Sequence, residues 1–176
     1  HPATLEKASP EGQFNELLKA LDSTDAKIFF TKANADTGGR AINRMIDGYV
    51  KSNTGKAFVV ASMGSLNYLS MMKFVDGVVG NSSSGIAEAP TFKIGTVNIG
   101  NRQKGRMRSK SVIDCKPISH DIKKAIIKLY SLNFKKQLKK TINPYEGKSI
   151  ASKAIKNILK RYVQKPLLEK DFYDLD

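Results

Sequence analysis

The sequence predicts an α/β fold in which a parallel sheet is covered by helices on both faces. Short, continuous apolar segments alternate along the chain with longer segments whose apolar residues recur at helical spacing. Continuous apolar segments are typical of strands buried on both faces, which is where parallel strands lie. At 176 residues the chain is long enough for one domain with a substantial core.

The elements can be assigned in order from the N-terminal side. Ser9 and Pro10 predict a helix start, because serine is a favoured N-cap and proline fits the first helical position. Phe14, Leu17 and Leu21 then fall on one face of that helix. Strands are predicted at residues 26–31, 57–61, 76–80, 96–99 and 111–114, and further helices around residues 42–50, 66–74, 120–131 and 149–163.

The most informative segment is residues 81–88, here called the serine turn. A short apolar strand ends there in Asn81, three serines and Gly85, and a helix is predicted to begin. Small residues let an anion approach the backbone, and the first helical N–H groups and three hydroxyl groups can donate to it. The segment is neither a Walker P-loop nor a dinucleotide-binding glycine turn. An ordinary serine-capped turn is the structural alternative.

A second polar segment follows the next predicted strand. Residues 101–108, here called the arginine loop, contain three arginines and one lysine among small or polar residues. Because the carboxyl ends of parallel strands lie at one edge of a sheet, we expect the serine turn and the arginine loop to face one crevice. Arginine binds pairs of phosphate oxygens, so together they suit a diphosphate. A solvated basic loop is the alternative.

The composition is strongly basic, with a formal net charge of +14. This charge would attract polyanions, so a basic nucleic-acid-binding module has to be considered. Against it, the chain has no aromatic-rich basic strand and no zinc-finger spacing, and lysines on the polar faces of helices dominate the excess. We therefore expect no nucleic-acid partner. Two histidines and one cysteine, far apart in sequence, predict no metal site.

The single cysteine and the length of the apolar segments bear on the cellular location of the protein. Cys115 ends an apolar strand and is interpreted as a small core residue. A lone thiol provides no disulfide framework, which fits a reducing cytoplasm. No apolar segment is long enough to span a bilayer, so we expect no membrane partner.

Three motifs in order carry a family resemblance: residues 34–40, residues 80–90 and residues 96–106. Together they resemble the hydrolysing UDP-N-acetylglucosamine 2-epimerases of sialic acid biosynthesis, along almost the whole chain. The resemblance implies a Rossmann-like domain, the C-terminal half of a glycosyltransferase-B-type enzyme that binds a UDP-sugar between two domains. Residues 1–163 would form this nucleotide-binding domain and residues 164–176 a tail. The N-terminal catalytic domain and the strand before His1 would be absent from this chain.

The resemblance also implies a reaction and a division of roles. UDP-N-acetylglucosamine would lose its C2 proton and UDP, and water would then add to give N-acetylmannosamine. The resemblance implies these roles for the matching substrate-binding and catalytic residues: Ser82 and Ser83, joined by Ser84, for the diphosphate; Gly85 for helix-start amides; Glu88 for the ribose hydroxyls; Arg102 and Arg106 near the phosphates; Asn34 near the uracil; and His1 as a hinge histidine beside the leaving group. The proton-transferring carboxylates would belong mainly to the absent domain, so the chain alone is expected to be inactive.

Other functions stay open at this stage. Relatives act on UDP-2,4-diacetamido-2,4,6-trideoxyglucose, and the sequence of this chain does not distinguish that substrate from UDP-N-acetylglucosamine. A UDP-sugar glycosyltransferase domain would use a similar nucleotide pocket. For the full-length enzyme the resemblance implies a cytoplasmic homo-oligomer that binds UDP and a UDP-amino sugar and needs no cofactor.

Overall fold

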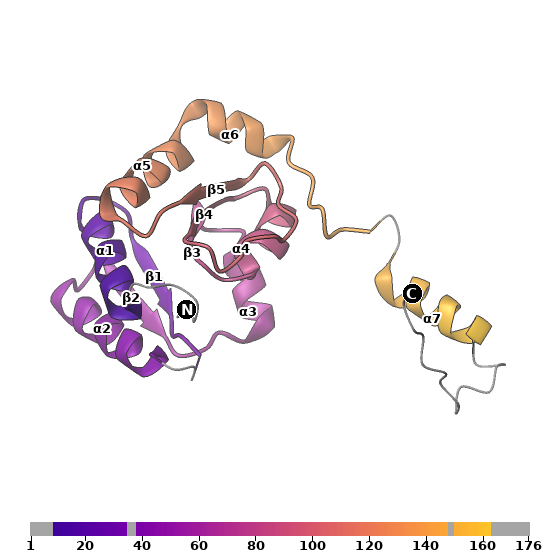
Figure 1. Ribbon diagram of the computed structural model, residues 1–176, viewed down its shortest axis with the longest axis horizontal. Helices are drawn as coiled ribbons and strands as arrows, with labels where there is room; N and C mark the ends of the chain where they lie inside the picture. Colours follow the sequence, from indigo (N-terminus) through magenta and orange to yellow (C-terminus); the bar gives the residue numbers. More distant parts are fainter. Residues whose placement is uncertain (1–8, 35–37, 148–149, 163–176) are drawn as a thin grey trace, which may run out of the picture. The chain divides into compact units, whose positions relative to one another are not determined.

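The computed structural model describes residues 9–34, 38–147 and 150–162. Their elements confirm the predicted alternation of strands and helices (Figure 1). The strands are β1 (Ile28–Thr31), β2 (Ala57–Val60), β3 (Gly77–Gly80), β4 (Gly95–Ile99) and β5 (Val112–Cys115). The helices are α1 (Pro10–Asp22), α2 (Gly39–Ser52), α3 (Gly64–Met71), α4 (Ser84–Ala87), the 3₁₀ helix η1 (Ala89–Phe92), α5 (Ser119–Tyr130), α6 (Leu132–Lys139) and α7 (Ala151–Tyr162).

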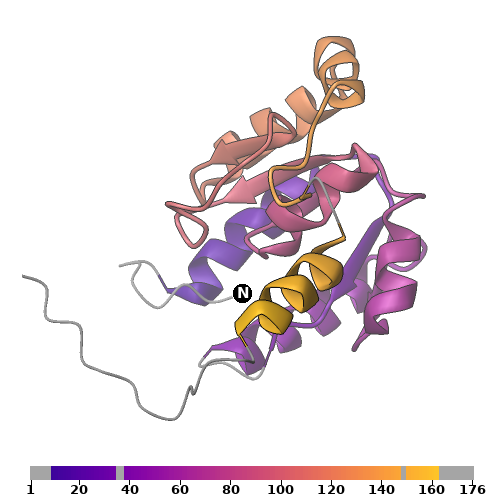
Figure 2. The same ribbon diagram turned by 90° about the vertical axis from the view of Figure 1, so that its right-hand side faces the viewer.

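All the strand pairs are parallel, as the sequence predicts. They form two sheets, however: β1 pairs with β2, and β3, β4 and β5 follow in that order. Helices α1, α2 and α5 lie on one side of the strands and α3 and α4 on the other (Figures 1 and 2). The fold class is therefore confirmed, with a break in the ladder between β1 and β3 that the sequence did not predict.

The N-terminal helix shows why these residues form their elements. The Ser9 hydroxyl accepts a hydrogen bond from the Gly12 N–H (3.1 Å), and Pro10 occupies the first turn, as predicted. The face carrying Phe14 packs toward Phe30 of β1, with ring centroids 6.3 Å apart. The apolar face therefore covers the two-stranded sheet.

One core extends under both sheets. All five residues of β4 are buried, and Val97 and Ile122 are fully inaccessible to solvent. The two sheets are also joined across their helices, since the Ser119 N–H at the start of α5 donates to Glu16 Oε2 on α1 (2.8 Å). This carboxylate caps a helix that has no N-cap side chain of its own.

The chain divides into two units, residues 1–144 and residues 145–176. The first contains both sheets and α1–α6. The second contains α7, on which no described side chain is buried. The domain boundary predicted at residue 163 stays a prediction.

None of the helices in the described part of the chain is both long and apolar enough to cross a bilayer.

Candidate functional site

The serine turn and the arginine loop meet at the carboxyl edge of the three-stranded sheet. The serine turn follows β3, the arginine loop follows β4, and these strands are ladder neighbours. The Asn81 carbonyl accepts hydrogen bonds from Arg102 Nη1 (3.1 Å) and from Gln103 Nε2 (2.8 Å). This convergence is the one predicted from the sequence, and parallel pairing of β3 and β4 produces it.

Gln103, which is not among the residues predicted for the site, holds the two loops together. Its side chain is buried, with 1% of its surface exposed, and its Oε1 has no hydrogen-bond partner among the described residues. The Arg108 guanidinium anchors the same loop, donating to the Gln103 carbonyl (2.9 Å) and pairing with the Asp114 carboxylate on β5. A glutamine within a basic loop gives no sequence signal of burial, so only the structure shows this role.

The serine turn offers fewer backbone donors than predicted. The Gly85 N–H donates to the Ser82 carbonyl (3.3 Å) and the Ile86 N–H to the Ser83 carbonyl (3.0 Å), while the Ser84 N–H makes a long contact with Ser82 Oγ (3.4 Å). Within the described residues, the N–H groups of Ser82 and Ser83 have no acceptor. Anion contacts from the backbone would therefore come from these two residues.

Helix α4 is also shorter than the sequence suggests. It has four residues and passes directly into η1, which has Pro90 in its first turn. Proline lacks an N–H and cannot continue an α-helix, so α4 ends there. Four residues align few peptide dipoles, so hydroxyl groups and arginines must supply most of any attraction for an anion.

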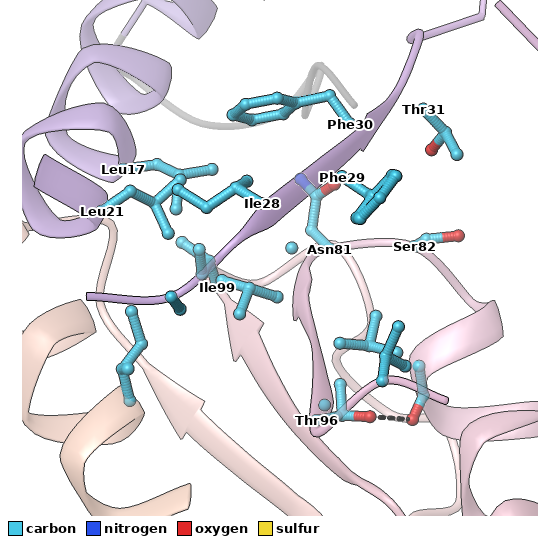
Figure 3. Close-up of a pocket in the computed structure, with 18 of the residues that line it drawn as sticks. Leu17, Leu21, Ile28, Phe29, Phe30, Thr31, Asn81, Ser82, Thr96 and Ile99 are labelled. Atoms are coloured by element: carbon cyan, nitrogen blue, oxygen red, sulfur yellow. Dashed lines mark hydrogen bonds between the residues drawn. The ribbon is translucent and has the colours of Figure 1, made fainter. Parts of the chain in front are cut away.

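The role expected of Gly85 needs correction. Its own N–H is already bonded within the turn, so it is not a free helix-start donor. A Cβ there would lie 2.5 Å from Thr96 Cγ2, and the Thr96 hydroxyl donates to the Gly85 carbonyl (2.7 Å; Figure 3). Glycine is therefore required for close packing of the serine turn on β4.

Ser84 is engaged by a residue that the sequence analysis did not connect with the turn. Its hydroxyl lies 2.5 Å from the Tyr68 hydroxyl of α3. Burial raises the pKa of Tyr68, with a smaller contribution from the charge of Glu88. The phenol therefore stays protonated at neutral pH and fixes Ser84 within the protein, so Ser82 and Ser83 are the serines better placed to contact a ligand.

The charged residues of the predicted site are exposed. Glu88 is the C-cap residue directly after α4, and its carboxylate has no hydrogen-bond or ion-pair partner in the described part of the chain. Arg102 and Arg106 are also exposed. Arg102, which bonds the Asn81 carbonyl, and the Glu88 carboxylate are thus both open to solvent at the serine turn.

Asn34 is a further predicted site residue, and it follows a strand of the other sheet. Asn34 is exposed beyond the carboxyl end of β1, and no hydrogen bond joins it to either loop among the described residues. Its carbonyl lies 2.1 Å from where a Cβ would stand on Gly39, so only glycine fits at the start of α2. His1 lies outside the described residues. No group of three or more metal-ligating side chains occurs within the described ranges.

Sequence comparison identifies relatives of this chain. Residues 1–160 match the family model for UDP-N-acetylglucosamine 2-epimerase. A Campylobacter jejuni protein named GDP/UDP-N,N'-diacetylbacillosamine 2-epimerase (hydrolyzing) is 43% identical over 176 residues, covering 99% of this chain and 45% of the relative. An Escherichia coli protein named polysialic acid biosynthesis protein P7 is 35% identical, with coverage of 99% and 45%.

Structure comparison agrees on the fold. A co-structure of S. aureus MnaA with UDP superposes with a TM-score of 0.66 at 17% identity, covering 93% of this chain and 43% of that one. The chain thus spans less than half the length of the relatives that it matches along its whole length. By its family model and its sequence relatives, the chain belongs to the UDP-N-acetylglucosamine 2-epimerase family.

Proposed function

We propose that this chain is the UDP-binding part of a hydrolysing 2-epimerase that acts on a UDP-2-acetamido sugar. One observation supports the proposal: the serine turn and the arginine loop meet at the Asn81 carbonyl, so that the serine hydroxyl groups and the Arg102 guanidinium lie at the same edge of the sheet. A UDP leaving group develops negative charge on its diphosphate as its bond to the sugar breaks. Fixed hydrogen-bond donors and cations stabilise that charge.

The roles follow from the exposed groups. Ser82 and Ser83 supply hydroxyl and free N–H donors to the diphosphate, and Arg102 and Arg106 supply cations. Arg102 already bonds the Asn81 carbonyl through Nη1, which orients the guanidinium toward the serine turn. Glu88 accepts hydrogen bonds from the two ribose hydroxyls, since two vicinal donors match two carboxylate oxygens.

The reaction needs groups beyond those described here. Removal of the C2 proton and later addition of water require a base and an acid. The family resemblance assigns these mainly to the other domain, with His1 beside the leaving group. We therefore expect the 176-residue chain to bind UDP without turning over substrate, and the complete protein to act as a cytoplasmic homo-oligomer.

Two substrates are candidates. The C. jejuni relative, 43% identical, is named for GDP- or UDP-N,N'-diacetylbacillosamine, and this supports UDP-N,N'-diacetylbacillosamine, the 2,4-diacetamido-2,4,6-trideoxyglucose derivative, as one candidate. The family match keeps UDP-N-acetylglucosamine as the other candidate. Both have an acetamido group at C2, so the same proton abstraction serves either.

Incubation of the full-length protein with each UDP-sugar in deuterium oxide tests the reaction. A hydrolysing epimerase releases UDP and a free sugar epimerised at C2, with solvent deuterium at that carbon. A glycosyltransferase would retain the C2 hydrogen and require an acceptor. A free sugar without C2 deuterium would contradict the proposal.

The ribose contact has its own test. UDP and 2'-deoxy-UDP are compared for binding to the chain and to the Glu88→Gln variant. Loss of one charged hydrogen bond predicts that the native chain prefers UDP by roughly tenfold and that the variant loses this preference. Glu11→Gln, which removes a carboxylate on α1, is the control and should keep it. An unchanged preference in Glu88→Gln would remove Glu88 from the site.

A further inference from the structure

The serine turn ends near a carbonyl that its own helix cannot pair. Helix α4 stops at Ala87, whose carbonyl would ordinarily accept from the N–H of residue 90 or residue 91. Residue 90 is Pro90, which has no N–H, and the Thr91 N–H donates instead to the Glu88 carbonyl (3.1 Å). The Ala87 carbonyl therefore depends on a donor from another part of the chain.

Asn143, which follows α6, supplies that donor from 56 residues away in sequence. Its Nδ2 donates to the Ala87 carbonyl (2.8 Å) and to the Thr91 hydroxyl (2.8 Å). An amide nitrogen carries two hydrogens, so these two contacts use both of them. A single side chain thus joins the end of α4 to the 3₁₀ helix η1.

The burial of Asn143 shows how much these bonds decide. Asn143 is 4% exposed, whereas Ile142, the residue before it, is 81% exposed. Folded chains usually bury isoleucine and leave asparagine in water. The reverse is tolerated here because the hydrogen bonds of the amide compensate for its removal from water. The segment after α6 is therefore held by what Asn143 bonds.

These contacts fix the backbone from which Glu88 projects. Glu88 is exposed, while Ile86 and Ala89 on either side of it are buried, with 1% and 0% of their surfaces exposed. The Glu88 N–H donates to the Ser84 carbonyl (3.0 Å), and its own carbonyl is bonded as well. Because Asn143 holds the preceding carbonyl, mainly the side-chain torsions of Glu88 stay free. A carboxylate on a fixed backbone loses less freedom when it binds a ligand.

The other end of the serine turn has a similar arrangement. Gln103, which is also buried, donates from Nε2 to the Asn81 carbonyl (2.8 Å), where Arg102 binds too. Buried carboxamides from two distant segments thus hold carbonyls near the two ends of the turn. Gln103 is next to the groups proposed for the diphosphate, and Asn143 acts where the carboxylate proposed for the ribose begins.

We propose that Asn143 is a positioning residue for Glu88 and that it sets the preference for a ribonucleotide over a 2'-deoxyribonucleotide without touching the ligand. The inference rests on the proposed function, in which Glu88 accepts hydrogen bonds from both ribose hydroxyls. Without the Asn143 amide, the Ala87 carbonyl loses its donor and the peptide that carries Glu88 can turn. The carboxylate then no longer meets both hydroxyls together, while the diphosphate contacts of Ser82 and Ser83 are kept.

Calorimetric titration of the 176-residue chain with UDP and with 2'-deoxy-UDP tests this role. The native chain should prefer UDP by roughly tenfold, and Asn143→Ala should reduce this preference to about threefold or less, with the affinity for 2'-deoxy-UDP kept within about twofold. A general loss of structure would weaken both ligands alike. Asn53→Ala is the matched control, because Asn53 Nδ2 also donates to a carbonyl at a helix end, that of Tyr49 on α2 (2.9 Å). It should keep the full preference.

Two further variants separate positioning from folding. Thr91 is exposed, so Thr91→Val removes one of the two acceptors of Asn143 at little risk to the fold. It should lower the preference for UDP by about twofold or more, and it decides the question if Asn143→Ala does not fold. Gln103→Met removes the amide at the other end of the turn. It should weaken UDP and 2'-deoxy-UDP alike and keep the preference between them.

Three outcomes would overturn the role of Asn143. The first is a full preference for UDP in folded Asn143→Ala, or in Thr91→Val, although Glu88→Gln has lost it; the proposed function would then still stand. The second is equal weakening of both ligands by Asn143→Ala. The third is loss of the preference in Asn53→Ala or Gln103→Met. A native chain that binds UDP without preference, or not at all, would contradict the proposed role of Glu88 itself, and the inference with it.

Discussion

The two sheets of the molecule differ in how completely they are enclosed. In the three-stranded sheet, β4 has a strand on each side and all five of its residues are buried. In the two-stranded sheet, Phe29 and Phe58 are exposed and stack on each other, with ring centroids 4.9 Å apart. Of the two loops of the predicted UDP site, the arginine loop follows β4, which has a strand on each side, and the serine turn follows β3, which has a strand on one side among the described residues. The arginine loop therefore has the more fully enclosed support.

The largest expected difference between the two sheets is in the cost of removing apolar side chains. Ile122 on α5 is fully buried above the three-stranded sheet, so Ile122→Ala should lower the free energy of unfolding by about 2–5 kcal/mol. Phe29→Ala, on the two-stranded sheet, should cost about 1 kcal/mol, mainly the stacked pair. Urea denaturation measures both. Equal losses would show that the two sheets are enclosed alike.

Two glycine substitutions, one in the serine turn and one on α2, compare how tightly the two regions are packed. Gly85→Ala places a Cβ 2.5 Å from Thr96 Cγ2, so it should destabilise the protein by about 1–3 kcal/mol. Gly48→Ala on α2 is the matched control, because a Cβ there meets nothing within 4 Å, and it should stabilise by up to about 1 kcal/mol. Chemical denaturation of both variants compares them. A neutral Gly85→Ala would mean that the serine turn is not packed tightly on β4.

The smallest expected stability effect concerns the hydrogen bond from the Ser119 N–H of α5 to the Glu16 carboxylate of α1, which links the two sheets. Hydrogen bonds from Lys19 and from the Ser119 N–H lower the pKa of Glu16 to about 2, against 4.5 as the ordinary value. Between these values the unfolded chain binds a proton that the folded protein does not. The stability that the ionised Glu16 carboxylate contributes to the folded protein is therefore complete above pH 4.5 and is lost as the pH falls toward 2.

Unfolding of native protein and of Glu16→Gln across that pH range checks the assignment. The native protein should lose more stability than the variant as the pH falls, since the variant has no carboxylate at this position. Glu11→Gln on the same helix should follow the native curve. Parallel curves for native protein and Glu16→Gln would contradict the role of Glu16 as a link between α1 and α5.

Most of the fold was predictable from local signals. Ser9 and Pro10 marked the start of α1, and the apolar segments marked the strands to within a few residues. Helix α6 was missed as a separate element, although Ser131 is its N-cap and accepts from the Phe134 N–H (3.3 Å). Pro90 in the sequence indicates that a helix beginning in the serine turn is short, but the prediction did not take it into account. These are errors in the use of signals that were present.

Other features depend on contacts between distant residues. The convergence of the two loops followed from parallel pairing, but Gln103 as their link did not. The pairing of Tyr68 with Ser84 needs α3 beside the turn. The exposure of Leu66 and the break between β1 and β3 depend on what each segment packs against, and a local pattern does not encode that.

The central claim is that the serine turn and the arginine loop together bind the diphosphate of UDP. NMR titration of the chain with UDP tests it most directly, comparing native protein, Arg102→Ala, and Lys136→Ala as a control for equal charge loss on α6. We expect saturable shifts at Ser82, Ser83 and Arg102, a dissociation constant raised about tenfold to a hundredfold by Arg102→Ala, and little change with Lys136→Ala. Absence of saturable shifts, or equal weakening in both variants, would contradict the claim.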